Sequence, residues 1–210
     1  TLNNTVVGSN TAAIEAASGL APGRALYLWG PPGAGRSHVL RAIAAEKSSI
    51  FFDLAASAAE IMGDNPHPVA QYWANARPFD MRHVDSPIYF TVKGEPVAHQ
   101  AVWIKALGDL PNDPVLHRAA LAYASDYTIL ESIYRRHGIA WSHPGLKSAS
   151  LDHAMWFHRD GRADQWLLYV QESPSAQGGR GLSLGRIFTR DGRLLATVAQ
   201  EGMVRVPELG

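Results

Sequence analysis

One long apolar helix constrains this chain more than any other feature of its sequence. Asp113-Pro114 is a helix start, with an aspartate as N-cap and a proline in the first turn. Arg135-Arg136-His137-Gly138 is the matching stop, with cations in the last turn and a glycine beyond it. Alanine, leucine and tyrosine leave the middle of this stretch almost no polar face, and such a helix is usually buried. We therefore predict one helix over 113–138 at the centre of a domain.

Strand-like runs surround that helix in the sequence. The run 100–107 precedes it, and four more follow it at 147–158, 165–172, 181–190 and 194–206. Asp191-Gly192 separates the last two runs and is a strong signal for a two-residue hairpin. The second half of the chain is therefore predicted to be α+β, with a central helix wrapped by an antiparallel sheet.

The first 55 residues follow a different pattern. A short apolar strand at 25–29 leads into a glycine-rich loop, a helix over 37–47 and a second strand at 50–54, which together make a βαβ unit. Gly63-Asp64-Asn65-Pro66-His67-Pro68 then reads as a loop or linker. We expect three parts: a truncated α/β segment over 1–55, a linker over 56–78 and the α+β domain over 79–206.

Composition excludes several classes of protein. The chain has 210 residues with 19 basic and 19 acidic side chains, and this balance argues against broad binding to nucleic acid or to an anionic membrane. It has no cysteine, so disulfides, thiolate metal sites and a cysteine nucleophile are excluded. No apolar run reaches the ~18 residues of a membrane span, and no leader is recognised, so we expect a cytoplasmic protein.

The glycine-rich loop is a candidate phosphate site. The spacing of Gly30, Gly35, Arg36 and Ser37 matches a P-loop in which arginine replaces the usual lysine, and Gly33 lies between the two outer glycines. Small residues let backbone N–H groups converge on phosphate oxygens at a helix N-terminus, and the Ser37 hydroxyl is suited to Mg²⁺. The alternative is a glycine-rich turn that binds no ligand.

The same region is similar to DnaA-related AAA+ proteins. The similarity rests on 4–10, Leu26-Tyr27-Leu28-Trp29-Gly30 and Gly33-Ala34-Gly35-Arg36-Ser37-His38, and it covers about residues 1–55. It implies ATP or ADP binding at the loop and a regulatory role in replication initiation. The chain departs from that family after its second strand, so the acidic strand, sensor residues and helical lid are missing.

A carboxylate on the apolar helix is the second candidate site. The neighbours of Asp126 at three and four residues are largely apolar, and a buried carboxylate is costly unless it is paired or functional. Burial would also raise its pKa toward the range of a general base. Gln200 is the only polar side chain on its face of the last strand. The alternative is that Asp126 is a structural residue bonded to nearby strands.

Residues 72–206 resemble the C-terminal hotdog domain of the acyl-CoA thioesterase II family. The resemblance rests on Leu121-Ala122-Tyr123-Ala124-Ser125-Asp126, on the run from Ser150 to Arg159, on Trp166-Leu167-Leu168-Tyr169, Arg180-Gly181 and Phe188-Thr189-Arg190-Asp191-Gly192, and on Ala199-Gln200-Glu201-Gly202. It implies a long helix wrapped by an antiparallel sheet. It also implies hydrolysis of fatty acyl-CoA to free fatty acid and CoA, with Asp126, Ser150 and Gln200 holding the attacking water and no cofactor required.

Members of that family usually carry two fused hotdogs, with the site between them. Here the first hotdog is absent and the P-loop segment stands in its place, so the chain looks chimeric. We therefore expect a homodimer or a higher homo-oligomer. A hotdog that has kept its fold and lost its activity is the remaining alternative.

Other polar residues carry weaker hypotheses. No metal site is expected, because His153 and His158 lie five apart on a predicted strand and would face opposite sides. Ser150, Asp152 and His153 are not expected to form a triad, since adjacent strand residues face opposite sides. Four arginines are candidates for contacts with CoA phosphates: Arg159, Arg162, Arg180 and Arg186.

Overall fold

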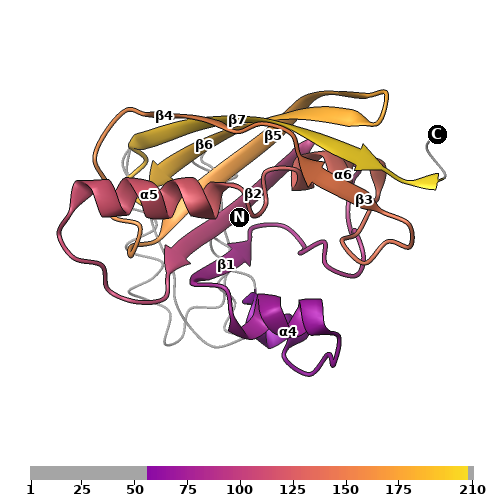
Figure 1. The fold of residues 1–210 in the computed structure, drawn as a ribbon, viewed down its shortest axis with the longest axis horizontal. Helices are drawn as coiled ribbons and strands as arrows, with labels where there is room; N and C mark the ends of the chain where they lie inside the picture. Colours follow the sequence, from indigo (N-terminus) through magenta and orange to yellow (C-terminus); the bar gives the residue numbers. More distant parts are fainter. Residues whose placement is uncertain (1–55, 208–210) are drawn as a thin grey trace, which may run out of the picture. The chain divides into compact units, whose positions relative to one another are not determined.

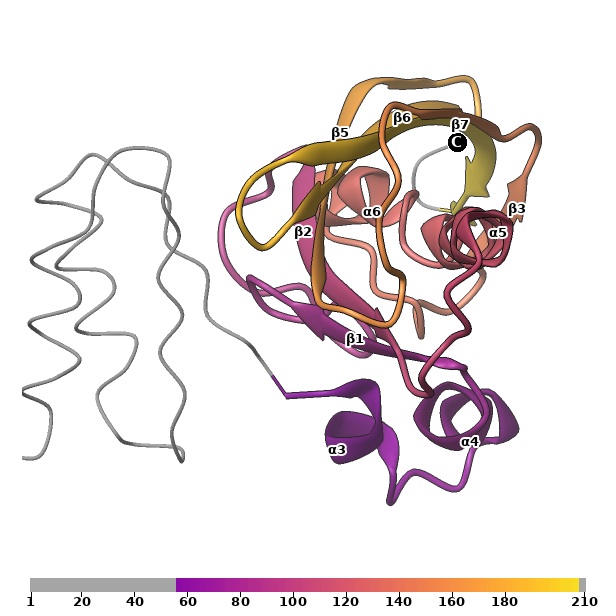
Figure 2. The same cartoon turned by 90° about the vertical axis from the view of Figure 1, so that its left-hand side faces the viewer.

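A computed structural model of the chain describes residues 56–207, in which one antiparallel sheet curves around two helices (Figure 1). The sheet runs in the order β1-β2-β5-β6-β7-β3, and β4 also pairs with β7. Figure 2 shows the sheet arching over the helices α5 and α6. The elements are α3 (Ala58–Met62), α4 (Pro68–Asn75), β1 (Phe79–His83), β2 (His99–Ala106), α5 (Pro114–Ser125), α6 (Glu131–His137), β3 (Lys147–Ser150), β4 (Ala154–Phe157), β5 (Leu167–Gln177), β6 (Arg180–Thr189) and β7 (Leu194–Arg205). The predicted α+β class is confirmed.

The predicted single helix over 113–138 is wrong, because residues 126–130 interrupt it. Its start is as expected, with the Asp113 side chain accepting the Val115 N–H, and its stop at Gly138 adopts the left-handed conformation with φ 68°. The interruption follows from side chains that bond to the sheet. Thr128 accepts a 2.7 Å hydrogen bond from Gln171 of β5. Tyr169 of β5 also donates to the Ser125 carbonyl at 3.1 Å, which is the acceptor that the N–H of residue 129 would use in a continuous helix.

The predicted strand 147–158 is also interrupted. Ser150 of β3 pairs with Gly202, and Ala154 of β4 pairs with Ala199, so four steps along this chain face three along β7. The extra residue makes a β-bulge. Asp152 stabilises it, because its carboxylate accepts the Glu201 N–H at 2.7 Å.

The other strands lie close to their predicted positions. β2, β6 and β7 begin or end within one residue of the runs 100–107, 181–190 and 194–206, and the turn at Asp191-Gly192 joins β6 to β7 with φ 84° at Gly192. β5 extends further than predicted, to Gln177. The sequence analysis did not identify β1 as a strand; it pairs with β2 from Phe79 to His83.

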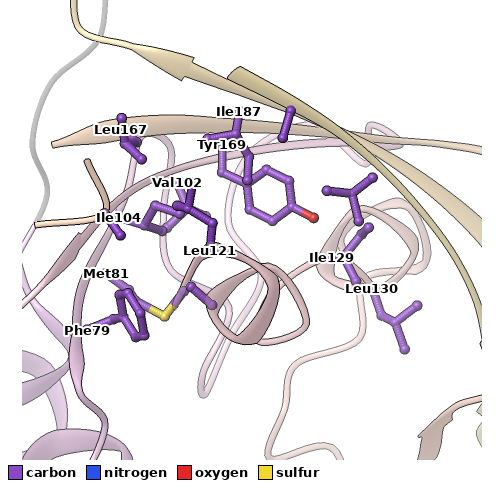
Figure 3. Packing of buried hydrophobic residues seen from close by; sticks show 14 of the residues in the cluster. Phe79, Met81, Val102, Ile104, Leu121, Ile129, Leu130, Leu167, Tyr169 and Ile187 are labelled. Carbon is purple, nitrogen blue, oxygen red and sulfur yellow. The ribbon is translucent and has the colours of Figure 1, made fainter. Parts of the chain in front are cut away.

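The core lies between the concave face of the sheet and the two helices. Figure 3 shows Met81, Ile104 and Leu121 meeting on one side, and Ile129 and Leu130 on the other. Gly202 of β7 lies so close to Leu130 that a Cβ at this position would overlap the leucine side chain. The interrupted helix therefore packs directly on the backbone of the sheet.

Residues 56–78, where a linker was expected, hold α3 and α4. Ser57 and Glu60 form a capping box that starts α3, and His67-Pro68 starts α4. The two helices share a small apolar cluster built from Met62, Ala70 and Tyr89. Within residues 56–207, no helix has the length and apolar character needed to cross a membrane. The division of the chain at residue 55 stays a prediction.

Candidate active site

Asp126, Ser150 and Gln200 meet at one place, although they come from three separate elements. Asp126 is the C-cap of α5, Ser150 ends β3 and Gln200 lies within β7. The Ser150 hydroxyl donates to Oδ1 of Asp126 at 2.9 Å. The Gln200 amide donates from Nε2 to the same Oδ1 at 2.9 Å and to the Ser150 Oγ at 2.8 Å. Each of the three side chains is therefore bonded to the other two.

The end of α5 fixes the position of Asp126. Tyr169 of β5 reaches up from the sheet, and its hydroxyl donates to the Ser125 carbonyl at 3.1 Å. Figure 3 shows the Tyr169 ring pointing from the sheet into the layer that holds Leu121 and Ile129. Burial and the nearby Asp126 charge raise the pKa of Tyr169, so its hydroxyl keeps its proton and remains a donor. Gly185 provides the space, because a Cβ there would overlap the Tyr169 ring.

The prediction that Asp126 is buried is wrong, because Asp126 is exposed in the structure. Gln200 is 0% exposed, whereas Asp126 and Ser150 lie at the surface. The reason is that Asp126 follows the last turn of α5 and sits beside β3, which is the edge of the sheet. Among residues 56–207 the side-chain donors to Asp126 bond to Oδ1 and none bonds to Oδ2, and Asp126 as a residue is exposed. Oδ2 is therefore the acceptor that the cluster leaves available.

A fourth residue, His153, joins the cluster, and the sequence analysis did not identify it as part of the site. Its Nδ1 is hydrogen-bonded to Oε1 of Gln200, and its Nε2 lies 3.0 Å from the Ser125 Oγ. In a regular strand Ser150 and His153 would face opposite sides, since they are three residues apart. The extra residue of the bulge between them puts both on the Gln200 side.

Exposed apolar side chains lie on the same elements as the cluster. Leu151 and Trp156 flank His153 along the chain, and Tyr123 lies one turn before Asp126 on α5. A cavity of about 460 Å³ is lined by Arg118, Phe157, His158, Arg159 and Asp160. An apolar edge of this kind beside a polar cluster is typical of a surface that another molecule covers.

Of the four candidate arginines, Arg159 alone lines that cavity. The other three are engaged with carboxylates: Arg162 with Asp164, Arg180 with Glu201 at 3.5 Å and Arg186 with Glu172 at 2.8 Å. In the described part of the chain, no three histidine or acidic side chains gather as metal ligands would. The phosphate-site residues Gly30, Gly33, Gly35, Arg36 and Ser37 lie outside the described residues.

Comparison with sequence families gives two matches. The family model described as acyl-CoA thioesterase matches residues 75–203, which is more than half of the chain and includes all four residues of the cluster. The family model described as "ATPase family associated with various cellular activities (AAA)" matches residues 26–85.

Individual proteins show the same similarity to the second half. Acyl-CoA thioesterase 2 of Haemophilus influenzae is 37% identical over 145 residues, which make up 68% of this chain and 50% of that protein. Acyl-coenzyme A thioesterase 8 of Homo sapiens is 42% identical over 131 residues, 61% of this chain and 40% of that protein. The chain thus spans about half the length of the curated relatives it matches.

Solved structures agree with these matches. The crystal structure of an acyl-CoA thioesterase II, TesB2, from Mycobacterium marinum aligns with a TM-score of 0.52 and 46% identity, covering 63% of this chain and 51% of that one. A protein of unknown function with a hot dog fold from Alicyclobacillus acidocaldarius aligns with a TM-score of 0.52 at 18% identity, covering 88% of this chain and 56% of that one. At that identity the second likeness concerns the fold alone, and the fold is a hotdog.

Proposed function

The chain belongs to the acyl-CoA thioesterase family, and on this premise we propose that it hydrolyses the thioester of a fatty acyl-CoA. One observation carries the proposal: Ser150 and Gln200 both donate to Oδ1 of the exposed Asp126, and no side chain among residues 56–207 donates to its other carboxylate oxygen. Oδ2 of Asp126 then accepts a proton from a water molecule, and the water oxygen attacks the thioester carbon.

The reaction is completed by the same carboxylate. The tetrahedral intermediate breaks its C–S bond and releases the CoA thiolate, which takes the proton that Asp126 received from water. The products are the free fatty acid and CoA. Ser150 and Gln200 act by holding Oδ1, so that Oδ2 keeps one direction toward the incoming water. The proposed mechanism uses side chains of the chain alone and requires no cofactor.

The proposal also includes a second copy of this chain. The cluster lies at an open edge of the sheet, where Trp156 is 53% exposed and Leu151 is also exposed. An acyl chain needs an apolar channel, and one edge supplies one wall of it. We propose that two copies associate through this edge as a homodimer or a higher homo-oligomer and enclose the acyl chain between them.

A thiol-release assay over a series of acyl chain lengths tests the function. We expect free thiol from the purified full-length chain, and a fall in kcat of about 10²-fold or more in Asp126→Asn, because the amide cannot accept a proton from water. Asp109→Asn is the matched control, since Asp109 is an exposed carboxylate in the loop after β2. Absence of thiol release from every acyl-CoA would contradict the function. An Asp126→Asn variant as active as the parent would contradict the mechanism.

A second candidate function concerns residues 1–55. We propose that Gly30, Gly33, Gly35, Arg36 and Ser37 bind the phosphates of ATP or ADP, as supported by the AAA match over residues 26–85. Calorimetry with each nucleotide tests this. Heat of binding that disappears in Arg36→Ala supports it, and no heat with either nucleotide contradicts it.

A further inference from the structure

We propose that His153 is a positioning residue for thioester hydrolysis, which locks the side-chain amide of Gln200 in the one orientation that holds Asp126. This inference rests on the function proposed above and adds a residue to the site. It is drawn from the contacts at the bulge, where Nδ1 of His153 is hydrogen-bonded to Oε1 of Gln200.

The orientation of the amide follows from its partners. The ionised Asp126 carboxylate can only accept hydrogen bonds, so the group that faces it at 2.9 Å must be the NH₂ of Gln200. The amide oxygen then points to His153. Because an amide oxygen can only accept, Nδ1 of His153 must carry a proton.

Flipping the amide by 180° would break both contacts. The amide oxygen would face the carboxylate of Asp126, and the NH₂ would face the Nδ1–H of His153. Two acceptors would then face each other on one side of the amide, and two donors on the other. Because Gln200 is 0% exposed, solvent cannot compensate for either mismatch. The imidazole therefore penalises the orientation in which Asp126 loses its hydrogen bond.

The imidazole is itself fixed by its other nitrogen. Nε2 lies 3.0 Å from the Ser125 Oγ, and this hydroxyl also contacts the Ala122 carbonyl at 2.9 Å. With neutral His153 the hydroxyl donates to Nε2. With the imidazolium Nε2 donates to the hydroxyl, which then donates to the Ala122 carbonyl. Nδ1 keeps its proton in both states, so the ring holds Gln200 in both.

Two isosteric amides separate the contact with Gln200 from the contact with Ser125. In His153→Asn the side-chain nitrogen is bonded to Cγ, as Nδ1 is, so it can donate to Gln200 while leaving Ser125. In His153→Gln the amide lies one bond further out, near the place of Nε2, so it can reach Ser125 while leaving Gln200. His153→Leu makes neither contact. His143→Gln is the control, because His143 lies in the loop before β3 and the ring of His143 is placed against the neighbouring Pro144 carbonyl, away from the cluster.

The kinetic test compares these variants in the full-length chain. We expect kcat to fall by about 10²-fold in His153→Gln and His153→Leu, the size expected for a misplaced catalytic group, while KM changes by less than about threefold. His153→Asn should recover most of kcat. A His153→Gln variant with the parent's kcat, or an Asn variant as impaired as the Leu variant, would overturn the proposal.

A second measurement does not depend on activity. Two-bond ¹H–¹⁵N spectra of the wild-type chain should place a proton on Nδ1 of His153, with the signals assigned by their loss in His153→Asn. An unprotonated Nδ1 would overturn the proposal even if the enzyme is active. If the wild-type chain releases no thiol, the proposed function fails, and the position of this proton still decides whether His153 orients Gln200.

Discussion

The amide of Gln200, which is completely buried, donates a 2.9 Å hydrogen bond to the carboxylate of Asp126, which is exposed and lies 74 residues earlier in the chain. The bond joins the inner face of β7 to the end of α5. The buried amide of Gln200 thus holds the carboxylate of the exposed Asp126 in one orientation. We therefore expect that substitutions at Gln200 change the orientation of the Asp126 carboxylate, while substrate can still reach Asp126.

Replacing Gln200 by Glu tests that coupling. The variant puts a second carboxylate beside Asp126, and the mutual repulsion raises the pKa of the pair, so that one of the two retains a proton. Because the pKa in the folded state then exceeds its unfolded value of ~4.3, the contribution of this pair to stability is largest below that pH and is lost as the pH rises through the folded value.

We expect the melting temperature of Gln200→Glu to rise on acidification from pH 7 to pH 5, and its kcat at pH 7 to fall by about 10²-fold. Thermal melts at several pH values and the thiol-release assay measure these quantities. Gln177→Glu, an exposed change at the end of β5, is the control. A melting temperature of Gln200→Glu that follows that of the control across the range would contradict the prediction.

The close approach of Tyr169 to Gly185 gives a second prediction. In Gly185→Ala the new methyl group would overlap the Tyr169 ring, so the tyrosine must move and its 3.1 Å bond to the Ser125 carbonyl weakens. Overpacking of this kind costs about 1–3 kcal/mol of unfolding free energy. We also expect a lower kcat, because the end of α5 carries Asp126.

Urea denaturation and the thiol-release assay measure the two effects. Gly108→Ala is the matched control, since a Cβ at Gly108 meets no atom within 4 Å, and we expect a change within about 0.5 kcal/mol. Equal stability of the two alanine variants would show that Tyr169 does not need Gly185.

The buried acid Glu131 gives a prediction on how stability depends on pH. Glu131 accepts hydrogen bonds from His83 at 2.7 Å, Trp141 at 2.8 Å and Gln100 at 3.0 Å. Burial raises the pKa of Glu131, but the charge of His83 and the three donors outweigh it, and the net pKa is lowered. The stability from this group is therefore present above its unfolded pKa of 4.5 and is lost as the pH falls through the folded value.

Replacing Glu131 by Gln should cost about 3–5 kcal/mol, the usual effect of removing one partner from a buried pair. Urea denaturation between pH 3.5 and 7 should show a smaller acid-induced loss of stability in this variant than in the parent. Glu172→Gln is the control, because its pair with Arg186 is solvent-exposed and contributes about 0–1 kcal/mol. Similar losses in both variants would contradict the assigned role of Glu131.

The proposed association of two copies is tested at the apolar edge. Trp156→Glu places a charge on a side chain that is 53% exposed, and we expect the oligomer to dissociate and kcat to fall. Leu107→Glu is the control, because Leu107 is 66% exposed at the end of β2. Light scattering coupled to size exclusion measures the mass of each. A monomeric parent, or a Trp156→Glu variant that stays associated, would refute the edge interface.

Local signals predicted a large part of the fold. The Asp113 cap, the Gly138 stop and the Asp191-Gly192 hairpin each depend on residues within one turn of the chain, and all three are present in the structure. The helix break at 126–130 was not predictable in the same way. Its causes, including the Gln171 partner of Thr128, lie on a strand about 40 residues away in sequence.

In the candidate site, too, some residues were predictable from the local sequence and one was not. Asp126 and Gln200 stood out as polar residues on apolar faces, and the family resemblance added Ser150. His153 did not stand out, because counting by twos along a predicted strand placed it on the wrong face. Only the pairing of Ser150 with Gly202 and of Ala154 with Ala199 reveals the extra residue. Period-two reasoning fails wherever a bulge is hidden in the run.

The extra residue between Ser150 and Ala154 shifts the alternation of side chains along this strand by one position. The proposed function therefore depends on the number of residues in this segment as well as on their side chains. Removing one residue between Ser150 and His153 would leave the two side chains two steps apart in an unbroken alternation, so the imidazole would still face Gln200. Removing both intervening residues would put the two side chains one step apart and turn the imidazole outward. Natural variants of this segment should therefore keep either one intervening residue in a regular strand or two with the bulge.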